Sequence, residues 1–289
     1  MSEVSSVDHV LIAVRDLETA TGAYEKLLGR AVSLRGSHPA YGSANAIFQL
    51  DNTYVELIAP TGNGPFADRL NARLETAGEG LFGIALGTPD AAALAAAWRS
   101  AGLAATDPQP GEGHGPDGTV RRWRNVYVPH EDVMGLFLFA IEHQSDAGGP
   151  PEAALHAVDH VVVNTPDADR SIRLFGDAMR IRLALDRDAP QWGARMLFFR
   201  LGGITLEVVQ RYGKDGALAS VDNGDAAYWG MAFRTANVEA AQARLAEADV
   251  DVSEVRKGRK PGTRVCTVRS GTCGVPVLII GPDGEAPAT

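Results

Sequence analysis

Two pairs of histidine and glutamate are the residues of this sequence best suited to chemistry. His9 and His160 both follow a Val-Asp dipeptide and lie 151 residues apart, and Glu56 and Glu207 keep the same separation. Imidazole and carboxylate groups bind divalent metal ions, and they also move protons to and from substrates. Each pair is therefore a candidate metal site or a candidate metal-free acid–base couple, with Glu56 and Glu207 as the catalytic residues. The alternative is a structural histidine bonded to its neighbour, which shared ancestry of the two halves would also repeat.

The same offset of 151 residues relates other parts of the chain. Segments 7–10, 41–42 and 54–58 recur as 158–161, 192–193 and 205–209. A fainter repeat lies within each half, where segments 81–86 and 228–233 are each predicted to form a strand that a helix follows. Repetition at a fixed period is typical of chains built from copies of one unit, so we expect four modules in two halves.

Each module is predicted to follow the order β-α-β-β-β. In the first, strand 10–14 is followed by a helix with Asp16 as its N-cap and Gly29 at its end, because the apolar residues between them share one helical face. A strand at 31–34 and a hairpin of strands 46–50 and 54–58 around the turn 51–53 complete the module. The later modules repeat the apolar helical face at three sets of positions: Leu94, Trp98 and Ala101; Ile172, Phe175 and Met179; Val238, Ala241 and Leu245.

Composition limits the classes of partner and compartment. The 289 residues are 45% hydrophobic and 22% charged, and 27 basic against 36 acidic residues give a net charge of -9, which disfavours nucleic acid and anionic membranes. Cys266 and Cys273 form no metal-binding or disulfide pattern, and the chain begins without a signal-peptide pattern, so we expect a cytoplasmic protein. The Gly- and Pro-rich stretch at 145–151 predicts two domains, 1–144 and 156–289, joined by a linker at 145–155.

The repeated module, with a histidine on its first strand and a glutamate on its last, resembles the vicinal oxygen chelate superfamily. Segments 7–14 and 77–81 look most like its methylmalonyl-CoA epimerase and glyoxalase I branch. The resemblance implies an α+β fold in which four βαβββ modules in tandem form two glyoxalase-like domains with curved mixed sheets. It also implies a small-molecule substrate, a divalent metal ion (Zn, Fe, Ni, Co or Mn) on the concave face of the sheet, and a homodimer, which is a habit of the superfamily.

The family pattern places metal ligands on the first and last strands of each module. His9 and Glu56 match in module one, and His160 and Glu207 match in module three. Modules two and four depart from the pattern, because the expected ligand positions hold Gly83, Phe139, Gly230 and Leu278. Pairing of module one with module two would leave two ligands in each cavity, whereas pairing of modules one and three would bring all four together.

Other residues are candidates for binding the substrate. Arg122 and Arg124 lie in a predicted inner strand of module two, where an arginine facing the cavity would bind a carboxylate. His114 lies in a glycine-rich loop from which it could reach the metal, and Trp192 would line an aromatic pocket. Solvated charges and ordinary core packing are the alternatives for these residues.

The resemblance implies a metal-dependent enzyme that stabilises an enolate-like intermediate of a small oxygenated substrate, as an isomerase, epimerase or lyase. One alternative is a metal-free, ligand-sequestering protein like the bleomycin-resistance members. Another is a protein like the extradiol ring-cleaving dioxygenases, which have four tandem modules but need two histidines and a carboxylate in the second half.

Overall fold

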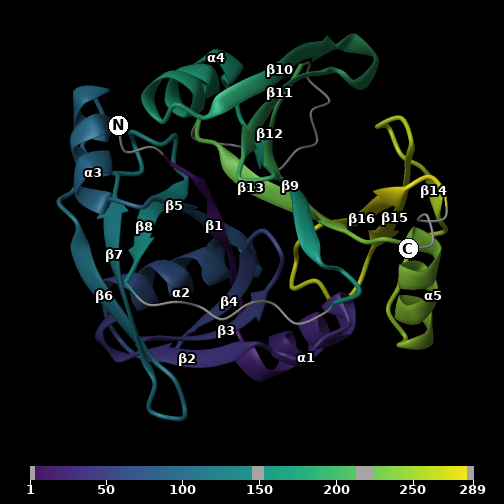
Figure 1. Cartoon of the computed structure of the whole chain (residues 1–289), viewed down its shortest axis with the longest axis horizontal. Helices are drawn as coiled ribbons and strands as arrows, with labels where there is room; N and C mark the ends of the chain where they lie inside the picture. The colour runs from purple at the N-terminus through teal and green to yellow at the C-terminus, as the bar shows by residue number, and fades with distance from the viewer. Residues whose placement is uncertain (1–3, 145–152, 213–223, 285–289) are drawn as a thin grey trace.

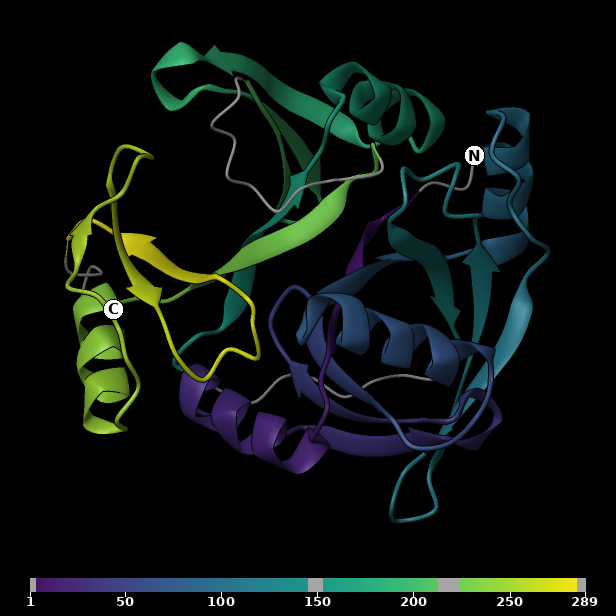
Figure 2. The same ribbon diagram turned by 180° about the vertical axis from the view of Figure 1, so that it is seen from behind.

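The computed structural model describes residues 4–144, 153–212 and 224–284, which form two curved mixed sheets with helices packed against them (Figures 1 and 2). Most of the predicted linker, residues 145–152, lies outside the described residues. The predicted α+β fold of four βαβββ modules in two glyoxalase-like halves is confirmed.

The first sheet closes into a barrel with the strand order β1-β4-β3-β2-β6-β7-β8-β5. Within each module the first and last strands pair in parallel, and modules one and two join through β1 and β5, which run antiparallel. A pairing of Ser37 on β2 with His114 on β6 closes the barrel on the opposite side. The strands are β1 (Ser6–Ala13), β2 (Leu34–His38), β3 (Ser43–Gln49), β4 (Tyr54–Pro60), β5 (Gly80–Gly87), β6 (Gln109–His114), β7 (Val120–Tyr127) and β8 (Phe137–His143).

The second sheet has the equivalent order β10-β11-β12-β9-β13-β16-β15-β14, but its edge strands β10 and β14 do not pair, so it stays open. Its strands are β9 (Ala157–Asn164), β10 (Arg182–Ala189), β11 (Ala194–Leu201), β12 (Ile204–Arg211), β13 (Ala227–Arg234), β14 (Arg256–Lys257), β15 (Thr263–Val268) and β16 (Val277–Pro282). The helices are α1 (Leu17–Leu28), α2 (Pro65–Ala77), α3 (Ala91–Ser100), α4 (Ala168–Ser171), which continues as a π-helical segment at Ile172–Ala178, and α5 (Val238–Glu247).

Local sequence signals explain the module helices. The Asp16 side chain accepts a hydrogen bond from the Thr19 backbone amide at the start of α1, and Gly29 ends the helix with φ of 70°. Asn237 caps α5 in the same way. These caps satisfy amide groups that have no partner inside a helix, and the predicted N-cap at Asp16 is confirmed.

Two expectations for the first half need correction. The strand expected at 31–34 is wrong in position, because β2 begins at Leu34 and the residues before it are tied to α1, where Glu25 Oε1 accepts from the Val32 amide. Helix α2 was not expected at all. Its buried Leu70 and Leu74 pack against residues that line the inside of the barrel, so α2 covers the concave face of the first sheet.

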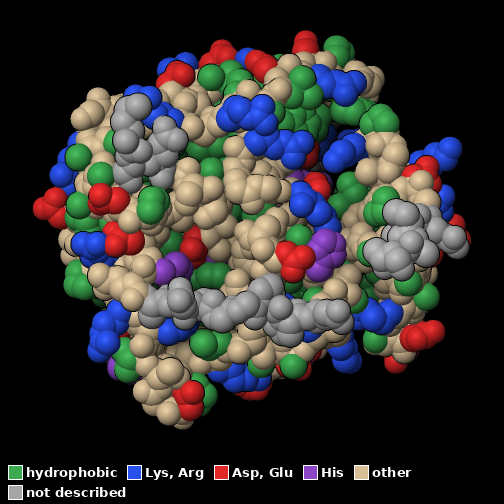
Figure 3. All heavy atoms as spheres, viewed as in Figure 1, with side chains coloured by type: hydrophobic (Ala, Val, Ile, Leu, Met, Phe, Trp, Pro, Cys, Tyr) green, Lys and Arg blue, Asp and Glu red, His purple; other side chains and the backbone are tan. Residues whose placement is uncertain are grey.

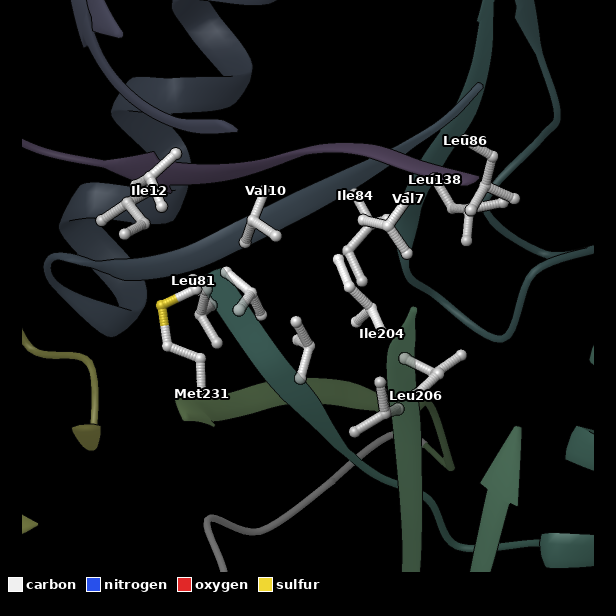
Figure 4. Close-up of a cluster of buried hydrophobic side chains, with 14 of the residues drawn as sticks. Val7, Val10, Ile12, Leu81, Ile84, Leu86, Leu138, Ile204, Leu206 and Met231 are labelled. Atoms are coloured by element: carbon white, nitrogen blue, oxygen red, sulfur yellow. The ribbon is translucent and has the colours of Figure 1, made fainter. Parts of the chain in front are cut away.

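The two halves share one hydrophobic core (Figure 4). Side chains of β1 and β5, among them Val10, Ile12 and Leu81, face Leu206 of β12 and Met231 of β13. Burial of apolar surface on both sides of this junction stabilises the contact between the sheets. Among the described residues, no helix is long and apolar enough to cross a membrane.

Candidate functional site

His9 and Glu56 lie side by side inside the first barrel. They come from the parallel strands β1 and β4. Glu56 pairs with Leu11, which lies two residues after His9 and therefore on the same face of β1. His9 Nε2 lies 3.3 Å from Glu56 Oε2, and the two side chains are only 4% and 7% exposed. Water therefore screens this pair weakly.

Asp8 holds the other nitrogen of His9. Its Oδ1 lies 2.7 Å from His9 Nδ1, and its Oδ2 lies 3.0 Å from His143 Nε2. Burial raises the pKa of the Asp8 carboxyl, but the hydrogen bonds to His143 and His9 outweigh burial and hold the pKa well below its ordinary value. An ionised Asp8 can only accept, so the Nδ1 hydrogen of His9 points to it and Nε2 points to Glu56.

A local irregularity of β1 makes this contact with Asp8 possible. Successive residues of a regular strand point to opposite faces, so Asp8 and His9 would point apart. The pairing of β1 with β5 shifts between Val7 and His9, which is a bulge at Asp8. The bulge turns the Asp8 side chain back toward the imidazole.

Further side chains fix the His9–Glu56 pair. Asn45 Nδ2 donates to Glu56 Oε1 at 2.7 Å, the Tyr54 ring stacks on the imidazole with 4.5 Å between centroids, and Phe139 meets it edge-on. Burial, with Asp8 and Glu56 nearby, raises the pKa of the Tyr54 hydroxyl far above its usual value. Tyr54 therefore stays neutral at physiological pH.

The pair opens into a cavity of about 80 Å³ inside the barrel, which is partly open to solvent. One group of lining residues is aromatic and apolar and the other is polar. The apolar group includes Tyr41, Phe66, Trp123, Tyr127, Phe137 and Phe139, and the polar group includes His38, Ser43, Asn45, Arg121, Asn125 and His143. Pockets of this composition, with a few convergent polar groups, are typical of small-molecule sites.

The equivalent pair of the second half is looser. His160 Nε2 lies 4.0 Å from Glu207 Oε2, and both side chains are more exposed, at 17% and 18%. Asp159 repeats the role of Asp8, with Oδ1 2.9 Å from His160 Nδ1, while Arg234 donates to its other oxygen. Burial raises the pKa of Glu207, although His160 and Arg259 oppose this shift.

Of the two module pairings that the sequence left open, the structure has the one that keeps the four ligands apart. Modules one and two share the barrel, and modules three and four share the open sheet, so His9 and Glu56 lie in one site and His160 and Glu207 in another.

The residues around each pair do not fit a resident metal ion. In the ranges that the structure describes, no three His, Cys, Asp or Glu side chains come together in a way that could hold one ion. A Cβ at Gly83 would lie 2.6 Å from Phe137 Cδ1, and one at Gly230 would lie 2.7 Å from the Pro276 carbonyl oxygen, so neither position has room for a ligand side chain. Catalytic zinc sites have three protein ligands, whereas each pair supplies two.

The predicted substrate-binding residues lie elsewhere. Arg122 lies near Glu112 on the outer side of the barrel, and Arg124 pairs with Glu142. His114 is on β6, where its Nε2 lies 3.1 Å from Glu112 Oε1, and it does not line the cavity. The expected alternation of β7 is shifted by one residue, so Arg121 lines the cavity instead of Arg122 and Arg124.

Trp192 lies on the second half, beside its concave apolar residues. The guanidinium groups of Arg187 and Arg259 lie 5.2 and 4.4 Å from the centre of the indole rings. Figure 3 shows Lys and Arg side chains over β10 to β12 on this face, next to hydrophobic side chains.

Sequence reasoning missed Asp8, Asn45 and Arg121. The aspartate left a signal, because Asp8 and Asp159 are repeated at the same offset as the histidines they hold. Asn45 left none, because Met196 occupies the equivalent position of the second half.

Comparisons with known proteins agree with this architecture. Residues 7–157 match the family model of the glyoxalase-like domain, and residues 159–267 match that of the Glyoxalase/Bleomycin resistance protein/Dioxygenase superfamily. A stretch of 61 residues, 21% of this chain, is 38% identical to an ethylmalonyl-CoA/methylmalonyl-CoA epimerase of Cereibacter sphaeroides, and the match spans 46% of that protein, less than half its length.

Solved structures resemble the chain over most or all of its length. A mutant 4-hydroxymandelate synthase from Streptomyces coelicolor is 14% identical with a TM-score of 0.67, and the match covers 100% of this chain and 95% of the synthase. A hypothetical protein from Staphylococcus aureus is 13% identical with a TM-score of 0.62, covering 94% of this chain and 97% of that one. At such identities the likeness concerns the fold alone. The chain belongs to the glyoxalase-like domain family and is a tandem, two-domain member of the vicinal oxygen chelate superfamily.

Proposed function

We propose that the first barrel is the active site of an enzyme that moves a proton on a small organic molecule, as isomerases, epimerases and lyases do. His9 and Glu56 act as an acid–base couple that needs no metal ion. The observation that carries the proposal is the buried 3.3 Å contact between His9 Nε2 and Glu56 Oε2, with Asp8 fixing the opposite nitrogen.

The polar surroundings of the couple favour the first half. Ser43, Asn45 and His38 line the first cavity, whereas Ala194, Met196 and Ala189 stand at the equivalent positions of the second half. Burial lowers the pKa of His38, so this imidazole is neutral at physiological pH and can accept or donate a hydrogen bond.

The couple holds one proton between two acceptors. With the proton on His9 Nε2, the Glu56 carboxylate removes a hydrogen from a carbon next to a carbonyl group, and the Nε2 hydrogen goes to the carbonyl oxygen, giving an enol. Return of the proton from Glu56 to another carbon of the enol, with the oxygen proton going back to His9, completes an isomerisation. An epimerisation requires the proton to reach the opposite face of the first carbon. Such general acid–base catalysis contributes about 10²- to 10⁴-fold in rate.

The experiment is a screen for proton exchange. Small carbonyl compounds with one hydrogen on the neighbouring carbon are incubated with the protein in D₂O, and deuterium incorporation is followed by NMR. We expect Glu56→Gln and His9→Asn to lower the rate at least about 100-fold. The repeat supplies matched controls, because Glu207→Gln and His160→Asn change the equivalent pair. If proton exchange were lost only in these two control variants, the catalytic site would lie in the second half, with Glu207 as its predicted catalytic residue.

Metal content tests the metal-dependent alternative. We expect elemental analysis of the untagged protein to find far less than one metal ion per chain, and exchange to survive EDTA. Near-stoichiometric metal that His9→Asn removes would contradict the metal-free couple and restore the mechanism implied by the resemblance.

The ligand-sequestering alternative is favoured by the aromatic lining of the cavity. It predicts tight binding of a compound without exchange in any variant. A dioxygenase would need a third ligand in the second half, where Gly230 and Leu278 supply no donor atom. A cytoplasmic location and a homodimer stay predictions.

A further inference from the structure

Arg121 is a cation inside the barrel whose charge is not matched. It lines the cavity and lies close enough to His38 and Tyr54 to affect both electrostatically. No carboxylate of the described residues forms an ion pair with it, although Arg122 and Arg124 on the same strand both have glutamate partners. Arg121 is only partly exposed, so an anion that enters the cavity gains a charge-assisted contact with its guanidinium.

Two buried amide oxygens in the same cavity lack hydrogen-bond donors. Asn45 Oδ1 and Asn125 Oδ1 have no partner among the described residues. The orientation of Asn45 is fixed, because its Nδ2 donates to the Glu56 carboxylate and its oxygen must therefore be the free atom. A buried acceptor without a donor costs free energy. Asn45 Oδ1 lies against Gly36 and is itself buried, so a hydroxyl or amine group of a ligand relieves this cost once a small side-chain movement opens the oxygen to the cavity.

The walls between these polar groups are aromatic. Phe66, Phe137 and Phe139 form a chain of ring contacts with centroids 5.3 to 5.8 Å apart, and Trp123 meets His38 edge-on. Such rings take up a flat or apolar body of about one ring in size.

We propose that the first cavity takes an organic monoanion with one ring-sized apolar body and a hydroxyl or amine donor. Its carboxylate binds Arg121, and its donor group binds Asn45 beside Glu56. The inference rests on the proposed function in that it names the substrate class of the same site. It makes Arg121 and Asn45 the residues that determine specificity.

Binding tests the inference without turnover. Isothermal titration compares three probes of matched size: 3-phenylpropionate, 3-phenyllactate and 3-phenylpropylamine. We expect both carboxylates to bind and the lactate to bind more tightly, because it adds a hydroxyl donor. The amine should bind at least about 10-fold more weakly than the lactate.

Variants assign the two contacts. Arg121→Gln should weaken both carboxylates by about 10-fold or more, whereas Arg122→Gln, which changes the neighbouring outer arginine, should leave them unchanged. Asn45→Val should remove the advantage of the lactate over the propionate. Circular dichroism and thermal unfolding check that each variant is folded, and Arg121→Lys, which keeps the charge, should retain part of the affinity if Arg121→Gln proves unstable.

The outcomes separate the inference from the proposed function. Tighter binding of the amine, equal effects of Arg121→Gln and Arg122→Gln, or no carboxylate binding would overturn the inference, while proton exchange could still depend on Glu56. Carboxylate binding that depends on Arg121 and persists in His9→Asn, without any exchange activity, would uphold the inference and contradict the acid–base proposal.

Discussion

The orientation of His9 depends on one neighbouring carboxylate. Asp8 fixes the Nδ1 hydrogen, so the atom that faces the cavity is always Nε2. Asp159 does the same for His160, although the distance from that imidazole to Glu207 is longer. The pair that is both oriented and close is therefore in the first half.

Replacement of Asp8 by asparagine tests this orientation. Asparagine can donate a hydrogen to Nδ1, which would move the imidazole hydrogen to Nε2. We expect long-range ¹H–¹⁵N NMR spectra to show this change of tautomer and proton exchange to fall about 10- to 100-fold. Asp159→Asn serves as the control, and equal loss of exchange in both variants would mean that Asp8 has no special role.

The two cysteines should be slow nucleophiles. Burial raises the pKa of Cys266 to about 11 and that of Cys273 to about 12. Because the thiolate is the reactive form, iodoacetamide at pH 8 should label the folded protein about 100-fold more slowly than the protein in denaturant. Mass spectrometry after timed quenching measures both rates, and rapid labelling of the native chain would contradict the burial of these thiols.

At the scale of elements, glycines on β5 and β13 decide what each site can hold. Each lies against the neighbouring parallel strand, where the space for a side chain is taken by Phe137 or by the Pro276 carbonyl. The strands pack this closely because glycine occupies both positions. At Gly83 and Gly230, the packing of the sheet therefore excludes the ligand side chains that the family pattern predicts.

Introducing the expected histidine at Gly83 should fail to build a metal site. We expect Gly83→His to lower the free energy of unfolding by about 2 kcal/mol or more, because the new side chain overlaps Phe137, and to bind no zinc in the folded protein. Urea unfolding and zinc titration measure both effects. Gly22→Ala on α1 is the control, since nothing lies within 4 Å of its Cβ, and it should stabilise by about 0.5–1 kcal/mol. A stable Gly83→His protein with one zinc would show that the barrel can still accept the metal.

At the scale of the whole molecule, the two sheets form one folding unit. Their apolar faces share a continuous core (Figure 4), and hydrogen bonds cross the junction, as from the Tyr228 hydroxyl to the Phe137 carbonyl oxygen at 3.1 Å. Tyr228 and Phe137 thus link the second sheet to the strand that lines the first cavity.

Cooperative unfolding follows from this shared core. Calorimetry should show one transition for the chain, and Met231→Ala should lower its midpoint while costing about 2–4 kcal/mol, because the side chain is buried at the junction. Leu185→Ala, at an exposed leucine, should change the free energy of unfolding by less than about 0.5 kcal/mol. Two separate transitions, with only one shifted by Met231→Ala, would show that the halves fold independently.

The sequence by itself determined the modules and the two His–Glu pairs. Repeated residues at a fixed offset, helix caps such as Asp16, and the apolar periodicity of the helices are local signals, so they can be read along the chain. The same signals could not place helix α2, whose apolar Leu70 and Leu74 acquire a partner only when the barrel has formed.

Tertiary structure decided which side chains meet. The bulge that turns Asp8 toward His9, the phase of β7 that brings Arg121 inside in place of Arg122, and the pairing of modules within each sheet all depend on strand register. Register is fixed by contacts between distant segments, and a shift of one residue exchanges the two faces of a strand. The sequence therefore determined which chemical groups are present, and the register of the sheets determined which of them share a site.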